Sequence, residues 1–173
     1  MNSDAASVYD VIVIGGGHAG CEAALACARM HAHTGLITLR HDDLATMPCN
    51  PAIGGIAKSH LVFELDALGG EIARHTDCTG IQFRVLNTRK GPAVQANRVQ
   101  CDKAAYSRRM REVIARTPGL DLIQAEATEL LIRKGRVAGV AVDNGQQAHA
   151  RAVVVTSGTY LHGQIHIGDE SRP

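Results

Sequence analysis

The residues best placed to do chemistry form a glycine run near the start of the chain. Gly15-Gly16-Gly17-His18-Ala19-Gly20 follows the apolar stretch 9–14 and precedes the Ala-rich stretch 21–30. This is the order of a strand, a G-x-G-x-x-G turn and a helix. In such a turn the first glycine allows a tight bend, the second lets a pyrophosphate approach the backbone, and the third lets the helix pack closely on the strand. The helix N-terminus adds free N–H donors and a positive dipole end. This order predicts dinucleotide binding, and the alternative is a plain strand–helix turn.

Cys49 is the second candidate for chemistry. It lies in an unusually long connection, 42–57, which also holds two prolines and the pair Gly54-Gly55. Ligands of doubly wound sheets lie beyond the carboxyl ends of strands, so this loop is expected to overhang the cofactor. A helix starting near Ala57 would place the cysteine near a helix N-terminus, where a thiolate is stabilised. The alternative is a half-buried structural cysteine, and both interpretations stay open at this point.

Positive charge is concentrated between residues 84 and 116. Only two acids, Asp102 and Glu112, lie among nine Lys and Arg there, an excess of seven in a chain of net charge +1. Such a local excess indicates a polyanionic partner, with an ordinary solvated helix face as the alternative. Phe83 and Tyr106 are the only aromatic residues nearby that could stack on bases. The nine cations are Arg84, Arg89, Lys90, Arg98, Lys103, Arg108, Arg109, Arg111 and Arg116.

Other chemistries have weaker support. The five cysteines are odd in number and form no C-x-x-C, which indicates neither a disulfide framework nor a zinc site and favours a reducing, cytoplasmic location. The close histidine pairs, His31 with His33 and His162 with His166, have no third ligand beside them, so no metal is expected. No apolar run reaches the length of a membrane span, and residues 1–7 do not resemble a signal peptide.

The elements that must position these residues alternate between strand and helix. We expect a parallel α/β sheet of the Rossmann type with a three-stranded meander inserted between its parallel strands. Asn144-Gly145 is predicted to form a type I′ hairpin turn. One feature departs from an ordinary NAD site, because no acid lies near Thr38 to Arg40, where the ribose would be held. The expected strands are 9–14, 34–39, 120–124, 128–133, 137–143 and 148–155, with 80–87 extended.

Two further helices are expected. The first covers 57–68, with Leu61, Leu65 and Leu68 on one face, and ends at a glycine pair. The second begins at Val94 or Asn97 and runs to Arg116, where Pro118-Gly119 closes it. Near the end of the chain, the strand 153–155 runs into small residues, and Gly158 is expected to let the backbone pass close to a cofactor.

Several motifs together resemble the GidA family, also called MnmG. The most specific are C-N-P-A-I-G-G and K-G-P-A-V, and the similarity runs from about Tyr9 to Gly168. The matching segments are G-G-G-H-A-G at 15–20, C-N-P-A-I-G-G at 49–55, D-A-L-G-G at 66–70, G-I-Q-F-R at 80–84, K-G-P-A-V at 90–94, R-V-Q-C-D at 98–102 and I-H-I-G at 165–168.

The resemblance implies a glutathione-reductase-type fold that binds FAD through residues 15–20 and a backbone contact at Ala127. It implies modification of the wobble uridine of tRNA at carbon 5, with an MnmE-type GTPase as partner, NADH as reductant and a methylene-folate as carbon donor. Cys49 matches a cysteine proposed to act covalently, by adding to carbon 6 of the uridine. Phosphate contacts to tRNA are expected from the basic segment. The residues expected to make them are Arg84, Arg89, Lys90 and Arg98.

The resemblance also has departures and limits. His31 stands where the family usually has a glycine at the end of a helix, a position that takes positive φ. Members of the family are several times longer and form homodimers. The 173 residues are therefore expected to be one FAD-binding domain, an N-terminal fragment with a flexible start at 1–8 and little activity alone. Two alternatives remain: a folate- and FAD-dependent tRNA uridine methyltransferase, and a non-catalytic dinucleotide-binding module.

Overall fold

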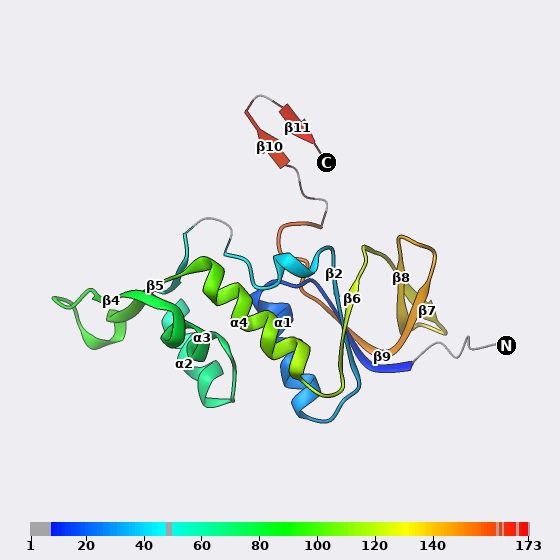
Figure 1. Ribbon diagram of the computed structural model, residues 1–173, viewed down its shortest axis with the longest axis horizontal. Coiled ribbons are helices and arrows are strands. Elements are labelled where there is room, and N and C mark those ends of the chain that lie inside the picture. Colours follow the sequence, from blue (N-terminus) through cyan, green and yellow to red (C-terminus); the bar gives the residue numbers. More distant parts are fainter. Residues whose placement is uncertain (1–7, 48–49, 162, 164, 169, 173) are drawn as a thin grey trace.

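The computed structural model describes residues 8–47, 50–161, 163, 165–168 and 170–172. It confirms a mixed α/β fold built on a mainly parallel sheet (Figure 1). The six-stranded sheet has the order β6-β2-β1-β9-β8-β7, in which β6, β2, β1 and β9 are parallel neighbours. Its strands are β1 (Val8–Ile14), β2 (Thr34–Thr38), β6 (Leu120–Gln124), β7 (Ala127–Arg133), β8 (Arg136–Val142) and β9 (Gln147–Val155).

Helices α1 (His18–Arg29) and α4 (Lys103–Arg116) cover one face of this sheet (Figure 1). The buried face of α1 consists mostly of small residues, so the helix packs closely on the strands. Helix α4 adds Tyr106, Met110 and Ile114 to the same core, all 1% exposed or less. Helix α1 ends as the sequence implied, because His31 has φ +64° and takes the position usually given to glycine.

A second buried cluster joins the antiparallel end of the sheet to its parallel strands. Val140 and Val142 of β8 pack in one buried cluster with Ile12 and Ile37 from the parallel strands. The predicted meander is present, but it is not a separate insertion between parallel strands. Its third strand is β9 itself, which pairs with β8 through residues 147–149 and with β1 through 149–155.

The hairpin turns differ from the prediction in one respect. Lys134 and Gly135 both have positive φ (+51° and +73°) between paired residues, as a type I′ turn requires. At the next turn only Gly145 has positive φ, and its N–H donates to the carbonyl of Val142 at 2.9 Å. Asn144-Gly145 therefore belongs to a longer hairpin loop with glycine in the left-handed position, and the type I′ prediction was wrong there.

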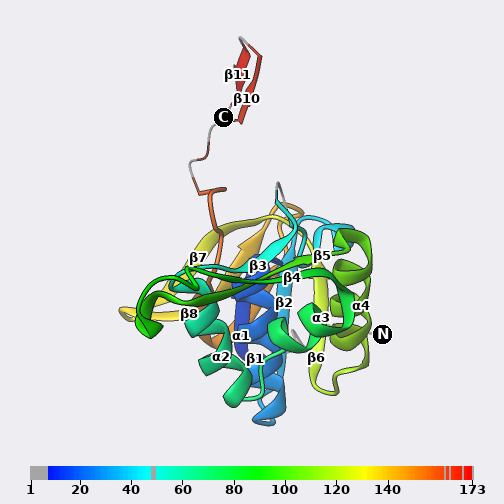
Figure 2. The same ribbon diagram turned by 90° about the vertical axis from the view of Figure 1, so that its left-hand side faces the viewer.

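A small subdomain is inserted between β2 and α4. It contains a three-stranded antiparallel sheet of order β3-β5-β4, with helices α2 and α3 packed on it (Figure 2). The sequence predicted two elements of this subdomain, the helix at 57–68 and the extended segment at 80–87, but not the others. The regular elements of the subdomain are the 3-10 helix η1 (His41–Asp43), β3 (Ala52–Gly54), α2 (Lys58–Ala67), α3 (Ile72–Thr79), β4 (Gly80–Leu86), the 3-10 helix η2 (Pro92–Val94) and β5 (Ala96–Cys101).

The predicted start of the long helix was wrong. Residues 96–101 form the central strand β5 of the small sheet, hydrogen-bonded to both β3 and β4. The helix begins only at Lys103, because Asp102 caps it by accepting a hydrogen bond from the N–H of Ala105 at 2.9 Å. Helix α2 also differs from expectation, since Leu61 and Leu68 are 63% and 87% exposed and form no buried stripe with Leu65.

The subdomain is fastened to α1 by charged groups. The carboxylate of Glu22 accepts hydrogen bonds from the N–H groups of Glu71 and Ile72 at 2.8 and 2.7 Å, at the start of α3. Arg29 donates to the Glu71 carboxylate and to the Gly69 carbonyl. Burial raises the pKa of Glu22, while the N–H groups of Glu71 and Ile72 oppose that rise. The helix of the glycine turn therefore also sets the position of the small subdomain.

The chain ends in a short hairpin that stands apart from the domain, β10 (Ile165–Ile167) and β11 (Glu170–Arg172) (Figures 1 and 2). No helix in the described part of the chain is long and apolar enough to cross a membrane.

Candidate functional site

The glycine turn between β1 and α1 is packed against backbone at its first and last glycines. Gly15 has φ +108°, and a Cβ there would lie 2.5 Å from the carbonyl oxygen of Thr156. A Cβ on Gly20 would lie 1.8 Å from the carbonyl oxygen of Gly15. Because neither backbone atom can move without moving a strand, both positions require glycine. Gly16 is similarly crowded, since its Cβ would lie 2.6 Å from Oγ1 of Thr38.

Gly17 is different, because a Cβ there would meet no atom within 4 Å. It is the N-cap of α1 and has no side chain that could accept from the first N–H groups. The first helical amide with a partner is that of Cys21, which donates to the carbonyl of Gly17 at 2.9 Å. Within the described residues, the N–H groups of His18, Ala19 and Gly20 have no acceptor. The turn thus offers open space beside free donors and the positive end of a helix.

Thr156, at the end of β9, holds the turn from the neighbouring strand. Its Oγ1 lies 2.8 Å from the carbonyl oxygen of Ile14 and 3.1 Å from that of Gly15, and its N–H donates to Ile14 at 2.8 Å. The sequence pointed instead to Gly158, which has φ +59° and where an added Cβ would meet no atom within 4 Å. Thr156 was missed because its role depends on a pairing about 140 residues away; the only local signal was a strand ending in small residues.

Ala127 lies near the carboxyl ends of the parallel strands, where the glycine turn also lies. It is the first residue of β7, half-buried and paired with Val142. Two residues earlier, the N–H of Ala125 donates to the carbonyl of Thr38 at 3.0 Å, which joins this segment to the carboxyl end of β2. The structure therefore places Ala127 near the carboxyl end of β2, and the glycine turn follows the carboxyl end of the neighbouring β1; a contact of Ala127 with the cofactor stays a prediction.

His18, the first residue of α1, turns its ring into the protein. The ring lies 5.5 Å from that of Tyr106, and its Nε2 is buried without a hydrogen-bond partner in the described structure. Burial, and then the charge of Lys58, lower the pKa of His18. The imidazole is consequently neutral near pH 7, so the positive character of the turn comes from its backbone.

A second buried histidine meets Tyr106 from the other side. His75 of α3 is 1% exposed, and its ring packs edge-on at 5.8 Å from the tyrosine. Burial lowers the pKa of His75, which outweighs the opposing charge of Glu71, whose Oε2 lies 3.4 Å from Nδ1. The Tyr106 hydroxyl is buried without a hydrogen-bond partner among the described residues. The rings of His18 and His75 therefore both contact Tyr106, and burial lowers the pKa of both histidines.

The cysteines divide into three groups, one of which is the exposed Cys78 of α3. Cys49, the predicted nucleophile, lies outside the described residues, and so does His162 of the histidine pairs. Cys21 is fully buried, and burial raises its pKa to about 12. Burial also raises the pKa of Cys27 and Cys101. These three thiols are protonated at neutral pH and unsuited to nucleophilic chemistry.

The four cations predicted to contact tRNA lie together on one hairpin. Arg84 of β4 and Arg98 of β5 are register partners, so their side chains share one face of the small sheet. Arg89 and Lys90 lie in the connection between these strands, which projects from the left of the molecule in Figure 1. In the described part of the chain none of the four has an acidic partner within 4.0 Å.

One of the remaining cations of the basic segment has a structural role. Arg111 of α4 donates to the carbonyl of Asp42 at 2.9 Å and to the hydroxyl of Ser107 at 3.3 Å, so it ties the helix to the loop after β2. The excess of positive charge is therefore divided between the hairpin, which carries four of the cations, and α4, which carries the other five.

The parallel order of the strands and the glycine turn between β1 and α1 define a domain of the Rossmann type. The chain belongs to the family described as Glucose inhibited division protein A, whose model matches residues 10–173.

Individual relatives agree with this membership. The tRNA uridine 5-carboxymethylaminomethyl modification enzyme MnmG of Geotalea uraniireducens is 56% identical over 160 residues, which are 92% of this chain and 26% of that protein. The crystal structure of Aquifex aeolicus GidA matches with a TM-score of 0.92 and 50% identity, over 96% of this chain and 28% of the other. The GidA-related protein of Thermus thermophilus, at 23% identity, a TM-score of 0.68 and 96% and 60% coverage, shares the fold. The chain thus spans about a quarter of the length of the curated relatives it matches.

Proposed function

We propose that this chain is the FAD-binding part of an enzyme that modifies the wobble uridine of tRNA at carbon 5. The observation that carries the proposal is the open space at Gly17 beside the free amides of His18, Ala19 and Gly20. Membership of the GidA family supports it, since relatives in that family are named as tRNA uridine modification enzymes.

The residues of the turn fit a diphosphate. Gly17 lets phosphate oxygens approach the backbone, and the amides that follow donate to them, aided by the helix dipole. Gly15, Gly16 and Gly20 keep the turn tight, and Thr156 fixes it to β9. Ala127, at the same edge, would contact the cofactor through its backbone. When bound, FAD supplies redox chemistry that no side chain of this chain can provide.

Cys49 is proposed as the nucleophile. Its thiolate would add to carbon 6 of the uridine, which places the electron pair at carbon 5. Carbon 5 would then attack the methylene carbon of the folate donor while one bond from that carbon to a folate nitrogen breaks and the nitrogen keeps the electron pair. Loss of the proton on carbon 5 with departure of the thiolate would restore the ring. Burial raises the pKa of Cys21, Cys27 and Cys101, which disfavours these three thiols for this role, whereas Cys78 is exposed.

The β4–β5 hairpin is proposed as part of the tRNA surface. Arg84, Arg89, Lys90 and Arg98 are exposed and have no acidic partner in the described structure, so they are available to phosphates. Such contacts position an RNA without reading its sequence.

Other parts of the proposal concern the longer protein. A methylene-folate donor, NADH, an MnmE-type GTPase and a homodimeric state are proposed from the resemblance to the family. A cytoplasmic location follows from tRNA as the proposed substrate. The alternatives can be distinguished by the nucleoside produced: a tRNA uridine methyltransferase would make a different one, and a non-catalytic module would make none.

Two experiments test the proposal. FAD titrated into the chain should bind and change the flavin absorbance, and failure to bind would remove the cofactor from the account. In cells whose only copy of the longer enzyme has alanine at the position of Cys49, mass analysis should find the carbon-5 modification lost. Normal modification would favour the non-catalytic module, and a 5-methyl product from the unaltered enzyme would favour the methyltransferase.

A further inference from the structure

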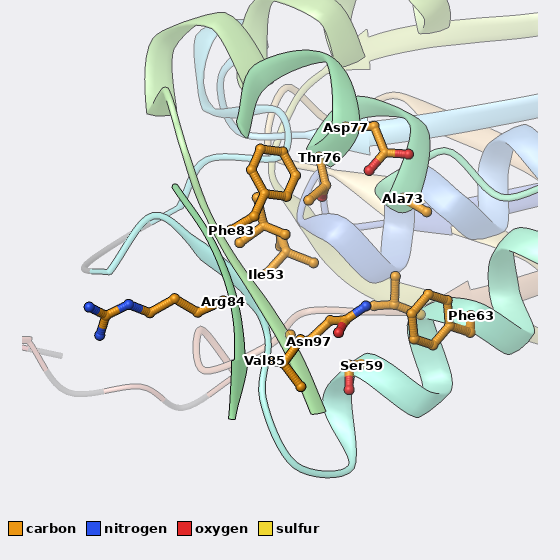
Figure 3. Close-up of a pocket in the computed structure, with 13 residues that line it drawn as sticks. Ile53, Ser59, Phe63, Ala73, Thr76, Asp77, Phe83, Arg84, Val85 and Asn97 are labelled. Carbon is orange, nitrogen blue, oxygen red and sulfur yellow. The ribbon is translucent and has the colours of Figure 1, made fainter. Parts of the chain in front are cut away.

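Both phenylalanines of the chain border one pocket of the small subdomain. The pocket has a volume of about 310 Å³ and lies between the β3-β5-β4 sheet and helices α2 and α3 (Figure 3). Phe63 comes from α2 and Phe83 from β4, and they are 56% and 59% exposed. Ile53 and Val99 form its buried apolar floor. In a chain with only 3% aromatic residues, two half-exposed rings at one pocket are a specific feature.

The ring of Phe83 is held in place by a glycine. A Cβ on Gly80 would lie 2.4 Å from Cζ of Phe83 and 2.8 Å from Cγ1 of Val99. The register of β4 against β5 also shifts between Gly80 and Gln82. This irregularity lets the ring fold back over the start of its own strand, so its position is set by the backbone although much of it is exposed.

Polar groups at the rim have unused hydrogen-bonding capacity. Asp77 of α3 and Asn97 of β5 line the pocket, are exposed, and have no hydrogen bond to their side chains within the described structure. A carboxylate accepts from N–H groups, and an amide both donates and accepts. This set matches the edge of a nitrogen heterocycle. An apolar peptide side chain placed there would leave both groups covered and unpaired, which is unfavourable.

Unpaired cations lie on the strands that form the pocket. Arg84 borders it, and Figure 3 shows its guanidinium directed away from the cavity. Its register partner Arg98 shares that outer face. Since β4 is an edge strand, an anionic chain crossing it would have cations on one side of the strand and the aromatic pocket on the other.

We propose that this pocket binds an unpaired nucleobase of RNA, stacked on Phe83 or Phe63, with the adjoining phosphates at Arg84 and Arg98. The inference rests on the proposed function, because it names a second contact of the same RNA substrate. Bases of single-stranded RNA are recognised by stacking on aromatic rings and by hydrogen bonds to their edges.

The test measures binding of a fluorescent single-stranded oligouridine of about ten nucleotides to the full chain. Phe83→Ala should weaken binding about fivefold or more, the effect of losing one stacked base. Phe83→Leu should recover only part of the loss, because it keeps apolar volume but removes the aromatic face. Leu61→Ala, an exposed apolar change on α2 that does not line the pocket, is the matched control and should have no effect. An oligonucleotide without bases should bind all four proteins equally.

Different failures point to different errors. If RNA binds and weakens with Arg84→Ala but not with Phe83→Ala, the pocket proposal is overturned while the proposed function stands. If Phe83→Ala leaves RNA affinity unchanged but alters the association state in sedimentation, the pocket is a protein interface and the proposal is wrong. If the unaltered chain binds FAD but no RNA, both the pocket and the RNA contact of the proposed function fail. Free uridine monophosphate distinguishes a base within RNA from a free nucleotide: tighter binding than the oligonucleotide would contradict the proposal.

Discussion

The glycine turn and the β4–β5 hairpin are both candidate binding regions, but they are built in opposite ways. The turn at 15–20 is shaped by the absence of side chains, and contacts with Thr38, Thr156 and the turn's own backbone crowd every glycine except Gly17. The hairpin carries side chains that have no acidic partner in the described structure, such as Arg84 and Arg98. A substitution at most positions of the turn is therefore expected to change stability as well as binding. A substitution at the hairpin is expected to change binding without changing stability.

The largest expected effect is at Gly20. Gly20→Ala places a Cβ 1.8 Å from the Gly15 carbonyl, so the helix and the strand must separate. We expect a loss of stability on the order of 3 kcal/mol, seen as a lower midpoint in denaturant unfolding. Gly55→Ala is a poor control because of its positive φ; Gly91→Ala, in open space with φ −61°, should unfold like the unaltered chain.

Removal of the Thr156 hydroxyl should have a smaller effect on the same turn. Thr156→Val keeps the shape but removes the hydrogen bonds to the carbonyls of Ile14 and Gly15. A loss of about 1 kcal/mol in stability is expected, together with weaker FAD binding, since the turn loses its anchor. Thr117→Val, at the end of α4 near the amino end of β2, removes a 2.7 Å hydrogen bond to the Val113 carbonyl away from the turn and should leave FAD affinity unchanged. Equal FAD affinity in both variants would show that Thr156 does not position the turn.

The buried histidine at the junction of the two regions should make stability depend on pH. The folded-state pKa of His75 is lowered by burial, so the folded protein binds fewer protons than the unfolded chain below about pH 6.5. Its contribution to stability is therefore complete above the unfolded pKa and is lost as the pH falls through the folded pKa. His75→Phe should flatten the decline in the unfolding midpoint as the pH falls below about 6.5. An equally steep decline in the variant would assign it to other groups.

At the hairpin, a charge change should affect RNA binding alone. Arg84→Ala is expected to leave the unfolding midpoint unchanged and to weaken RNA binding more at low salt than at high salt. If Arg84 contacts one phosphate, the slope of log affinity against log salt falls by about 0.7 for single-stranded RNA. Arg133→Ala, on the distant β7–β8 hairpin, is the matched charge control. A loss common to both variants would indicate nonspecific attraction.

The two regions also differ in how far the sequence predicted them. The glycine turn, β1, α1 and β2 were predicted because their signals are local: strand, turn and helix follow within 30 residues. Strand β5 was mistaken for helix, since its identity depends on pairing with β3 and β4 on either side. Helix α3 was missed because Glu22, about 50 residues earlier, supplies the cap at its start.

The same reasoning applies to the site residues. The four hairpin cations were predicted from composition, but their convergence depends on the register of β4 with β5. Thr156 gave no signal of its own because its contacts with the turn arise only when β9 lies beside β1. A cofactor contact at Ala127 was predicted from the family resemblance alone, and the structure places this residue near the carboxyl end of β2, beside the strand that leads into the turn.

The most direct test of the central claim is an FAD titration of the Gly17→Ser variant against the unaltered chain. Serine at an N-cap is favourable, and φ −71° with ψ −177° suits it, so the unfolding midpoint should stay the same or rise. Its side chain would occupy the open space and take an amide of the first turn, so FAD affinity should fall at least about tenfold, or 1.4 kcal/mol. Unchanged FAD affinity in the folded variant, or no FAD binding by the unaltered chain, would contradict the claim that this backbone holds the diphosphate.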